Sequence, residues 1–318
     1  MIRDTGFTVT AEEAGQRFDS VLQGRFPSAS RAFCREAAET GQVLVNGRPC
    51  LKGHKLRLGD GVTVESLKEA RDNRVRSDAS VPVRIVFEDG HLIAANKPAG
   101  QPVHPLTSEE TGTLMNGLVA RYPELAELGD QPLMAGALHR IDTGTSGLVL
   151  AARTQAAFDD LRAQFEAQEV AKIYLALVEG HVAVAGRLTH DLAHHPAFRG
   201  KMVDAQSLAT PDRRMRAETS YRPLELAGRD TLLEVAIRTG VTHQIRCQLA
   251  LGGFPVVNDT LYGAKPVENC TRHFLHAYEI RFRHPATGQP CCIRVPLSLD
   301  FQEGCKAPLD GCGRYGTY

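Results

Sequence analysis

Residues 139–150 read His-Arg-Ile-Asp-Thr-Gly-Thr-Ser-Gly-Leu-Val-Leu, a turn of small residues followed by an apolar run. Glycine and short side chains tolerate unusual backbone angles, so residues 143–147 predict a tight turn. The apolar residues 148–152 have the length of a buried strand. Asp142 is therefore predicted to lie on a loop held by a rigid strand, which is how a nucleophile is presented. Alternatively, its carboxylate only ends the turn by bonding to its own backbone.

Composition excludes several classes of protein. The chain has 318 residues, of which 42% are hydrophobic, enough for a large core and two domains. No apolar run reaches membrane-spanning length and the first twenty residues are charged, so we expect a cytoplasmic location and no membrane partner. Eight cysteines without Cys-x-x-Cys spacing predict reduced thiols and no metal site, with Cys305 and Cys312 as the one candidate pair.

Charge is balanced overall, with 37 basic and 37 acidic residues, but it is unevenly distributed. Residues 31–57 and residues 199–216 each carry an excess of lysine and arginine. A run of charge is usually a solvated face, yet two basic segments are also consistent with a polyanionic partner. In the first segment the candidate RNA-binding residues are Arg31, Arg35, Lys52 and Lys55.

The chain divides by pattern into four parts. Residues 1–66 predict a small α+β domain, with a helix over 32–39 and short strands over 41–47 and 58–64. Residues 67–80 are charged and aperiodic and predict a linker. Residues 81–300 predict an α+β domain on a mostly antiparallel mixed sheet with a central active-site cleft, because strands and helices do not alternate regularly. Residues 301–318 are glycine-rich and predict a loose tail.

Within the larger domain, two elements have clear signals. Residues 154–167 predict a helix capped by Thr154 that buries Phe158 and Leu161. Residues 231–237 predict a strand. Polar residues occur in four segments where folding does not require them: 93–100, 139–150, 172–180 and 239–246. Taken singly, each has a packing explanation. In the segment 239–246, Thr242 is predicted to cap a helix whose first turn holds His243, Gln244 and Arg246.

Together these segments resemble the RluA/RluD-like pseudouridine synthases over about residues 85–296. The matching motifs are Asn-Lys-Pro-x-Gly at 96–100, His-Arg-x-Asp-x-x-Thr-Ser-Gly at 139–147, Lys-x-Tyr-x-Ala-x-Val-x-Gly at 172–180, Thr-Gly-x-Thr-His-Gln-Ile-Arg at 239–246, Asn-Asp-x-Leu-Tyr-Gly at 258–263 and Leu-His-Ala at 275–277. The small domain is similar to the RNA-binding domain of the ribosomal protein S-four type, through Arg17-Phe18-Asp19, Ser30-Arg31, residues 41–47 and Gly59-Asp60.

The resemblance implies a reaction that needs no cofactor: the isomerisation of uridine in RNA to its carbon-linked form. Asp142 is implied to be the nucleophile, adding either to the anomeric carbon or to carbon 6 of the ring. A carboxylate in a dry site must be kept ionised, and Arg246 is the implied partner. Tyr174 is implied to lie against the target ring and to relay a proton.

Further residues are implied to contact the substrate. The target base has to leave the RNA stack, and Arg140 is implied to fill the gap that it leaves. We also assign His139, Lys97 and Thr145 to substrate binding, with Lys97 equally suited to a structural role. Ribosomal RNA is favoured over transfer RNA as the partner, and no obligate protein partner is expected.

Two positions depart from the family pattern, Val241 where arginine is usual and Asn258 where glycine is usual. The first removes a cation and so favours a change in RNA binding or substrate choice. An alternative function is a non-catalytic RNA-binding protein with the same fold, although Asp142, Tyr174 and Arg246 are all present. A hydrolase built on Thr-Ser-Gly, or on His190, His194 and His195, lacks suitable spacing.

Overall fold

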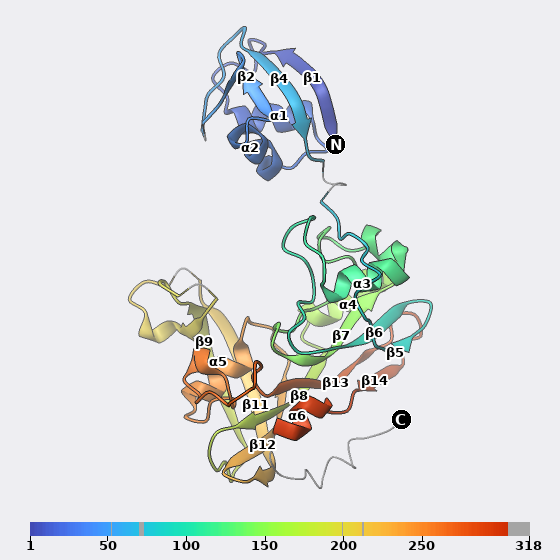
Figure 1. The fold of residues 1–318 in the computed structure, drawn as a ribbon, viewed down its shortest axis with the longest axis vertical. Coiled ribbons are helices and arrows are strands. Elements are labelled where there is room, and N and C mark those ends of the chain that lie inside the picture. Colours follow the sequence, from blue (N-terminus) through green and yellow to red (C-terminus); the bar gives the residue numbers. More distant parts are fainter. Residues whose placement is uncertain (52, 70–72, 199, 212, 305–318) are drawn as a thin grey trace. The chain divides into compact units, whose positions relative to one another are not determined.

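The computed structural model describes residues 1–51, 53–69, 73–198, 200–211 and 213–304, which form two compact units (Figure 1). The first unit comprises Met1–Arg76, Leu106–Glu110 and Gln131–Leu133. The second comprises Ser77–Pro105, Thr111–Asp130 and Met134–Tyr318. The two units are described separately below.

The first unit is a small sheet with two helices. Its elements are β1 Ile2–Thr8, α1 Phe18–Arg25, α2 Arg31–Glu39, β2 Val43–Val45, β3 Arg48–Pro49 and β4 Gly61–Leu67, with the antiparallel strand order β1-β4-β2-β3. Ser30 caps α2 by accepting a hydrogen bond from Phe33 N. Phe18, Leu22 and Val64 belong to the shared core. Strand β4 ends at Leu67, which is fully buried and lies one residue inside the predicted linker.

The second unit is built on one large sheet of ten strands within the described residues. These are β5 Ile85–Glu88, β6 Leu92–Lys97, β7 Ser146–Ala152, β8 Ala171–Val178, β9 Gly186–His194, β10 Met202–Asp204, β11 Met215–Ala227, β12 Asp230–Ile237, β13 Leu275–Arg283 and β14 Pro290–Arg294. The order is β10-β9-β11-β12-β8-β13-β7-β6-β5, with β14 also pairing with β13. Only β13 and β7 run parallel, which confirms the predicted α+β class with a mostly antiparallel mixed sheet.

Helices pack on this sheet. They are α3 Leu114–Arg121, α4 Gln155–Glu166, α5 Gln244–Leu251 and α6 Leu299–Gly304, with short 3-10 turns η2 Pro123–Glu127, η3 Ala205–Ser207 and η4 Thr260–Tyr262. Helix α4 packs on β7 and β13, and α5 packs on β9, β10 and β11. The predicted cap of α4 is confirmed, since the Thr154 side chain accepts from Ala157 N.

The segment predicted to be a loose tail, residues 301–318, begins inside a helix. Residues 301–304 belong to α6, and Phe301 is fully buried with its ring against Phe274. The rest of that segment, 305–318 with Cys305 and Cys312, lies outside the described residues. The other six cysteines are free thiols.

At the centre of the sheet, two backbones approach so closely that one position admits only glycine. Strand β7 is buried along its whole length between β6 and β13. Gly147 in this strand has φ of 114°, and a Cβ there would lie 2.2 Å from the carbonyl oxygen of Ala277. No other residue fits this backbone conformation without moving β13. The glycine of Thr-Ser-Gly therefore fixes the point at which the loop that carries Asp142 enters the sheet.

Candidate active site

The loop that carries Asp142 is fixed by backbone and side-chain hydrogen bonds. Thr145 N donates to Asp142 O at 3.0 Å and closes the predicted turn. His139 Nε2 accepts a hydrogen bond from Leu150 N at 3.1 Å, so the start of the loop is tied to β7. The His139 ring also stacks on Phe165, with centroids 5.4 Å apart. Burial lowers the pKa of His139 to about 3, so its ring is neutral and suited to a structural contact.

Lys97, which was predicted to bind substrate, holds this loop by hydrogen bonds to backbone carbonyls. Lys97 is fully buried, and its Nζ donates to the carbonyl oxygens of Pro98, Gln101 and Thr143 at 2.8, 2.7 and 3.2 Å. Burial lowers the pKa of Lys97 to about 7, whereas the three acceptors favour its protonated form. This amine joins the end of β6 to the residue after Asp142. Its side chain has no exposed surface in this structure, which favours the structural role over substrate binding.

Thr145, which was also predicted to contact the substrate, lies against His273 in this structure. Its side chain is buried, and its Oγ1 lies 2.9 Å from His273 Nε2. The adjacent Gly144 leaves room for this ring, since a Cβ there would lie 2.9 Å from His273 Cε1. The Thr-Gly-Thr part of the loop is thus shaped to receive His273.

Arg246 bridges two carboxylates. Its Nη1 donates to Asp142 Oδ2 at 2.9 Å, and its Nε and Nη2 donate to Asp259 at 2.5 and 2.8 Å. The guanidinium and Asp259 are buried, whereas a quarter of the Asp142 side chain is exposed. Asp259 thus receives the bidentate contact that fixes the plane of the guanidinium. Asp142 receives a single N–H and keeps its second oxygen for other partners.

The pKa of Asp142 reflects two opposed effects. Burial alone would raise it, because a low-dielectric site disfavours the charged form. At the acidic pH where Asp142 titrates, the charges of protonated His243 and of Arg246, together with the hydrogen bond from Arg246, hold the pKa below its usual value. Asp142 is therefore an ionised carboxylate at neutral pH on a side chain that is a quarter exposed, which suits a nucleophile.

The remaining predicted residues lie as follows. Tyr174 lies in β8 between Val235 of β12 and Ala277 of β13 and is almost fully buried. Burial and the negative charge of Asp142 raise the pKa of Tyr174, so its phenol keeps its proton. Arg140 is exposed at the surface of the loop. The structure thus joins Asp142 to Arg246 and brings the charge of Asp142 to bear on Tyr174.

Sequence reasoning missed three residues that contact this group: Asp259, His243 and Tyr262. His243 Nε2 lies 3.8 Å from Asp142 Oδ2, and its Nδ1 lies 3.1 Å from the Tyr262 hydroxyl. Tyr262 also carries Arg246 over its ring, 5.3 Å from the centroid. Asp259 and Tyr262 both belong to the motif at 258–263, which was the available signal.

Helix α5 begins one residue later than predicted. Its N-cap is His243, in a left-handed conformation and without a capping side chain, so the prediction that Thr242 caps the helix is wrong. The Gln244 side chain reaches out of the helix and binds the turn that precedes it and β11. Its Oε1 accepts from Val241 N and Thr239 Oγ1, and its Nε2 donates to Glu218 O on β11.

Both departures from the family pattern have a local explanation. Asn258 has φ of 63°, a conformation open to glycine and tolerated by asparagine. Its amide also donates to the carbonyls of Cys270 and Arg272 and accepts from Val267 N. Val241 packs against the apolar cluster that includes Leu192 and Met202. Neither substitution touches the contact between Asp142 and Arg246.

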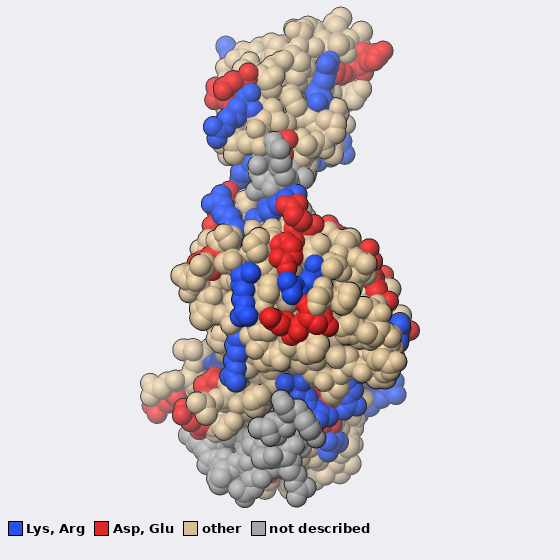
Figure 2. All heavy atoms as spheres, turned by 90° about the vertical axis from the view of Figure 1, so that its right-hand side faces the viewer, with Lys and Arg blue, Asp and Glu red and all other residues tan. Residues whose placement is uncertain are grey.

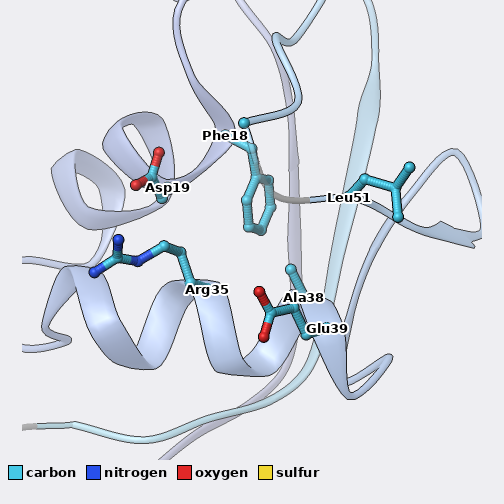
Figure 3. A pocket seen from close by; sticks show the side chains of 7 residues that line it. Phe18, Asp19, Arg35, Ala38, Glu39 and Leu51 are labelled. Atoms are coloured by element: carbon cyan, nitrogen blue, oxygen red, sulfur yellow. The ribbon is translucent and has the colours of Figure 1, made fainter. Parts of the chain in front are cut away.

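In the first unit, the predicted RNA-binding residues are partly paired. Arg31 lies 3.9 Å from Asp19, which is also bonded to Arg17. Arg35 lines a small pocket with Phe18 and Leu51 (Figure 3). Lys55 is exposed, and Lys52 lies outside the described residues. The face in Figure 2 carries both basic and acidic side chains, and several basic side chains lie side by side in the lower part of the view.

Comparison with known proteins identifies the family. The family model for RNA pseudouridylate synthases matches residues 91–251. The chain belongs to this family. It is 35% identical over 302 residues to a ribosomal large subunit pseudouridine synthase D of Xanthomonas campestris, covering 91% of this chain and 88% of that protein. A protein of the same name from Escherichia coli is 32% identical, covering 93% and 91%.

The solved structures agree on the fold. The human RNA pseudouridylate synthase domain-containing protein 1 matches with a TM-score of 0.56 at 24% identity, covering 70% of this chain and 86% of that chain. The predicted family of RNA uridine isomerases is confirmed by these findings. Among the described residues, no His, Cys, Asp or Glu side chains are grouped to hold a metal ion. None of the helices described is long and apolar enough to cross a membrane.

Proposed function

We propose that this chain converts uridine to pseudouridine in ribosomal RNA of the large subunit, with Asp142 as nucleophile. The observation that carries the proposal is the ionised, partly exposed Asp142 carboxylate held by the buried Arg246. The names of the relatives support the substrate class. A cytoplasmic location and the absence of an obligate protein partner belong to the same proposal.

The reaction is an internal exchange of bonds and needs no co-reactant. The bond from N1 of the base to the sugar breaks, the base turns, and a bond from carbon 5 to the sugar forms. Carbon 5 loses a proton and N1 gains one. Asp142 adds to the anomeric carbon or to carbon 6 and later leaves, so it is regenerated.

Neighbouring side chains have separate tasks in this proposal. Arg246 keeps Asp142 charged before attack, and Asp259 keeps Arg246 in place. Tyr174 contacts the ring and, because its phenol stays protonated, begins any proton relay as a donor. Arg140 is exposed beside the nucleophile, where its planar guanidinium can stack on the bases next to the flipped uridine.

The first unit is proposed to grip the RNA. Within the proposed domain of residues 1–66, Arg31, Arg35, Lys52 and Lys55 supply positive charge for the backbone of a structured RNA. The synthase domain of residues 81–300 then receives the target uridine. Base flipping costs a few kcal/mol, and this cost is smallest in loops and bulges, where we expect the target to lie.

Replacement of the nucleophile tests this proposal directly. Wild type and Asp142→Asn are incubated with large-subunit ribosomal RNA that lacks modifications, and pseudouridine is mapped by carbodiimide labelling and primer extension. We expect wild type to create at least one site and Asp142→Asn to lower the rate by about four orders of magnitude or more. RNA binding by the variant should persist, because Asn is isosteric and Asp259 still holds Arg246.

Transfer RNA serves as the matched substrate control. If wild type modifies transfer RNA but not ribosomal RNA, the substrate assignment is wrong and the assignment of Asp142 stands. If wild type binds RNA yet modifies neither, the alternative of a non-catalytic RNA-binding protein replaces this proposal. Family membership and the intact contact between Asp142 and Arg246 both count against that alternative.

A further inference from the structure

His243 has a backbone conformation that calls for an explanation. Its φ of 52° and ψ of 20° lie in the left-handed region, which is strained for a residue with a side chain. It occupies the N-cap of α5 but its side chain makes no capping hydrogen bond. The left-handed turn therefore does not serve the helix. Its effect is to place the imidazole ring between Asp142 and Tyr262.

The Tyr262 hydroxyl has its proton free for His243. A hydroxyl has one proton to donate and two lone pairs to accept. The Tyr262 oxygen accepts a hydrogen bond from Met202 N at 2.9 Å, so that contact does not use the proton. The other neighbour is His243 Nδ1 at 3.1 Å. Burial raises the pKa of Tyr262, so the phenol stays protonated and donates to Nδ1.

This contact selects one tautomer of His243. A nitrogen that accepts a hydrogen bond carries no proton, so a neutral ring must carry its proton on Nε2. Nε2 faces Asp142 Oδ2 at 3.8 Å, slightly beyond hydrogen-bond distance. Catalytic hydrogen bonds are often long before substrate binds and shorten afterwards. The ring thus presents an N–H to the carboxylate without being fully engaged by it.

Charges around the ring leave it neutral. Burial lowers the pKa of His243, and the positive charges of Arg246 and Arg140 act in the same direction. The negative charges of Asp142 and Asp259 oppose this without reversing it. A neutral donor has an advantage here, because a second cation beside Arg246 would draw negative charge away from the attacking oxygen. Asp142 keeps its nucleophilic character and gains a group that orients it.

We propose that Tyr262 and Met202 N–H hold His243 as a neutral Nε2–H donor that orients the Asp142 carboxylate for attack. His243 and Tyr262 are positioning residues in this proposal, and Asp142 remains the attacking group. The tautomer itself follows from the hydrogen bonds alone, whereas its use in the reaction rests on the function proposed above. The two parts are therefore tested by separate measurements.

The tautomer is measured by long-range ¹⁵N–¹H correlation spectra of the full chain labelled with ¹⁵N-histidine. His243→Gln identifies the signals of residue 243 by their loss. We expect an unprotonated Nδ1 and a protonated Nε2 at neutral pH in wild type, and loss of this pattern in Tyr262→Phe. A protonated Nδ1 or a doubly protonated ring in wild type would overturn the proposal. Tyr122→Phe is the matched control, because its hydroxyl bonds to Glu88 away from this site.

Two substitutions of His243 test whether its Nε2–H contributes to the reaction. Gln places its amide N–H near the position of Nε2, whereas Asn places it near Nδ1 and is better suited to the left-handed backbone. A donor role predicts that His243→Gln keeps about tenfold more kcat than His243→Asn, the effect of roughly one hydrogen bond. A purely structural role predicts the opposite order. Equal or reversed activities would overturn the donor role, whatever the spectra show.

Discussion

Charge gathers in two regions of this molecule, and the regions differ in burial. Around Arg246, the guanidinium is 8% exposed and Asp259 is 2% exposed, with contacts of 2.5 to 2.9 Å. Around Asp19 in the first unit, the side chains of Arg17 and Arg31 are 47% and 51% exposed. Water and salt screen the second group but not the first.

This difference in burial predicts that the group around Arg246 affects the reaction rate, whereas the group around Asp19 affects RNA binding. Opposite charges that are buried attract one another strongly and shift each other's pKa values. Removal of one of them leaves its partner as an uncompensated buried charge. Exposed charges act additively and weakly, through the ions that they displace from RNA. Substitutions in the buried group should therefore change the reaction by orders of magnitude. Substitutions in the exposed group should change how binding responds to salt.

The largest effect is expected for Arg246→Gln. Without the guanidinium, Asp142 and Asp259 are left as buried carboxylates without their shared cation, which costs about 3–5 kcal/mol of unfolding free energy. We expect kcat to fall about 10²–10³-fold, the scale of a lost electrostatic contact in a dry site. Denaturant unfolding and single-turnover rates measure the two effects.

The same substitution should invert the dependence on pH. In wild type the folded pKa of Asp142 is lowered, so this carboxylate stabilises the fold above its unfolded pKa of about 4. That contribution is lost as pH falls through the folded pKa. In Arg246→Gln, burial dominates and the pKa rises, so protonation on acidification should partly restore stability. The acid limb of kcat should also move toward neutral pH. Arg246→Lys is the control, since it keeps the charge; an unmoved limb in Arg246→Gln would contradict this account.

Sequence patterns predicted the parts of the site that are local. Asp142 on its turn and α4 with its Thr154 cap appear as predicted, whereas the contact between Arg246 and Asp142, 104 residues apart, was implied by the family motifs. Each depends on residue types at fixed short spacing or on a motif. The fold class followed in the same way, from the irregular mixture of strand and helix signals.

Long-range partnerships were not accessible in this way. Nothing in Asn-Lys-Pro says that the Lys97 amine points inward to three carbonyls, one of them 46 residues away. Asp259 meets Arg246 only because η4 and α5 pack together. Thr242 has the better capping chemistry, yet the helix begins one residue later with His243 at the N-cap, and the Gln244 side chain binds Val241 N. In each case, tertiary contacts overrode the local preference.

An intermediate effect is expected for Lys97→Met, which keeps the volume of the side chain and removes its charge. Three partly buried hydrogen bonds to backbone carbonyls are lost, so we expect unfolding free energy to fall by about 2–4 kcal/mol. The loss of the bond to Thr143 O should also lower kcat more than it raises KM, because the nucleophile loop loosens. An unchanged kcat with lowered stability would show that the loop is held without Lys97. His284→Gln, at the contact with Asp89 in the same unit, controls for general destabilisation.

The smallest effect is expected for Arg31→Ala and Lys55→Ala in the first unit. If each side chain neutralises one RNA phosphate, each substitution should reduce the slope of log affinity against log salt by about one. The rate at saturating RNA should not change, since neither residue belongs to the group around Arg246. Filter binding at several salt concentrations measures the slope, and Arg162→Ala on α4 is the control for a surface arginine paired with a glutamate. An unchanged slope in both variants would assign RNA binding to another surface. A loss of kcat would show that the exposed charges also affect the reaction, which contradicts their proposed role in binding alone.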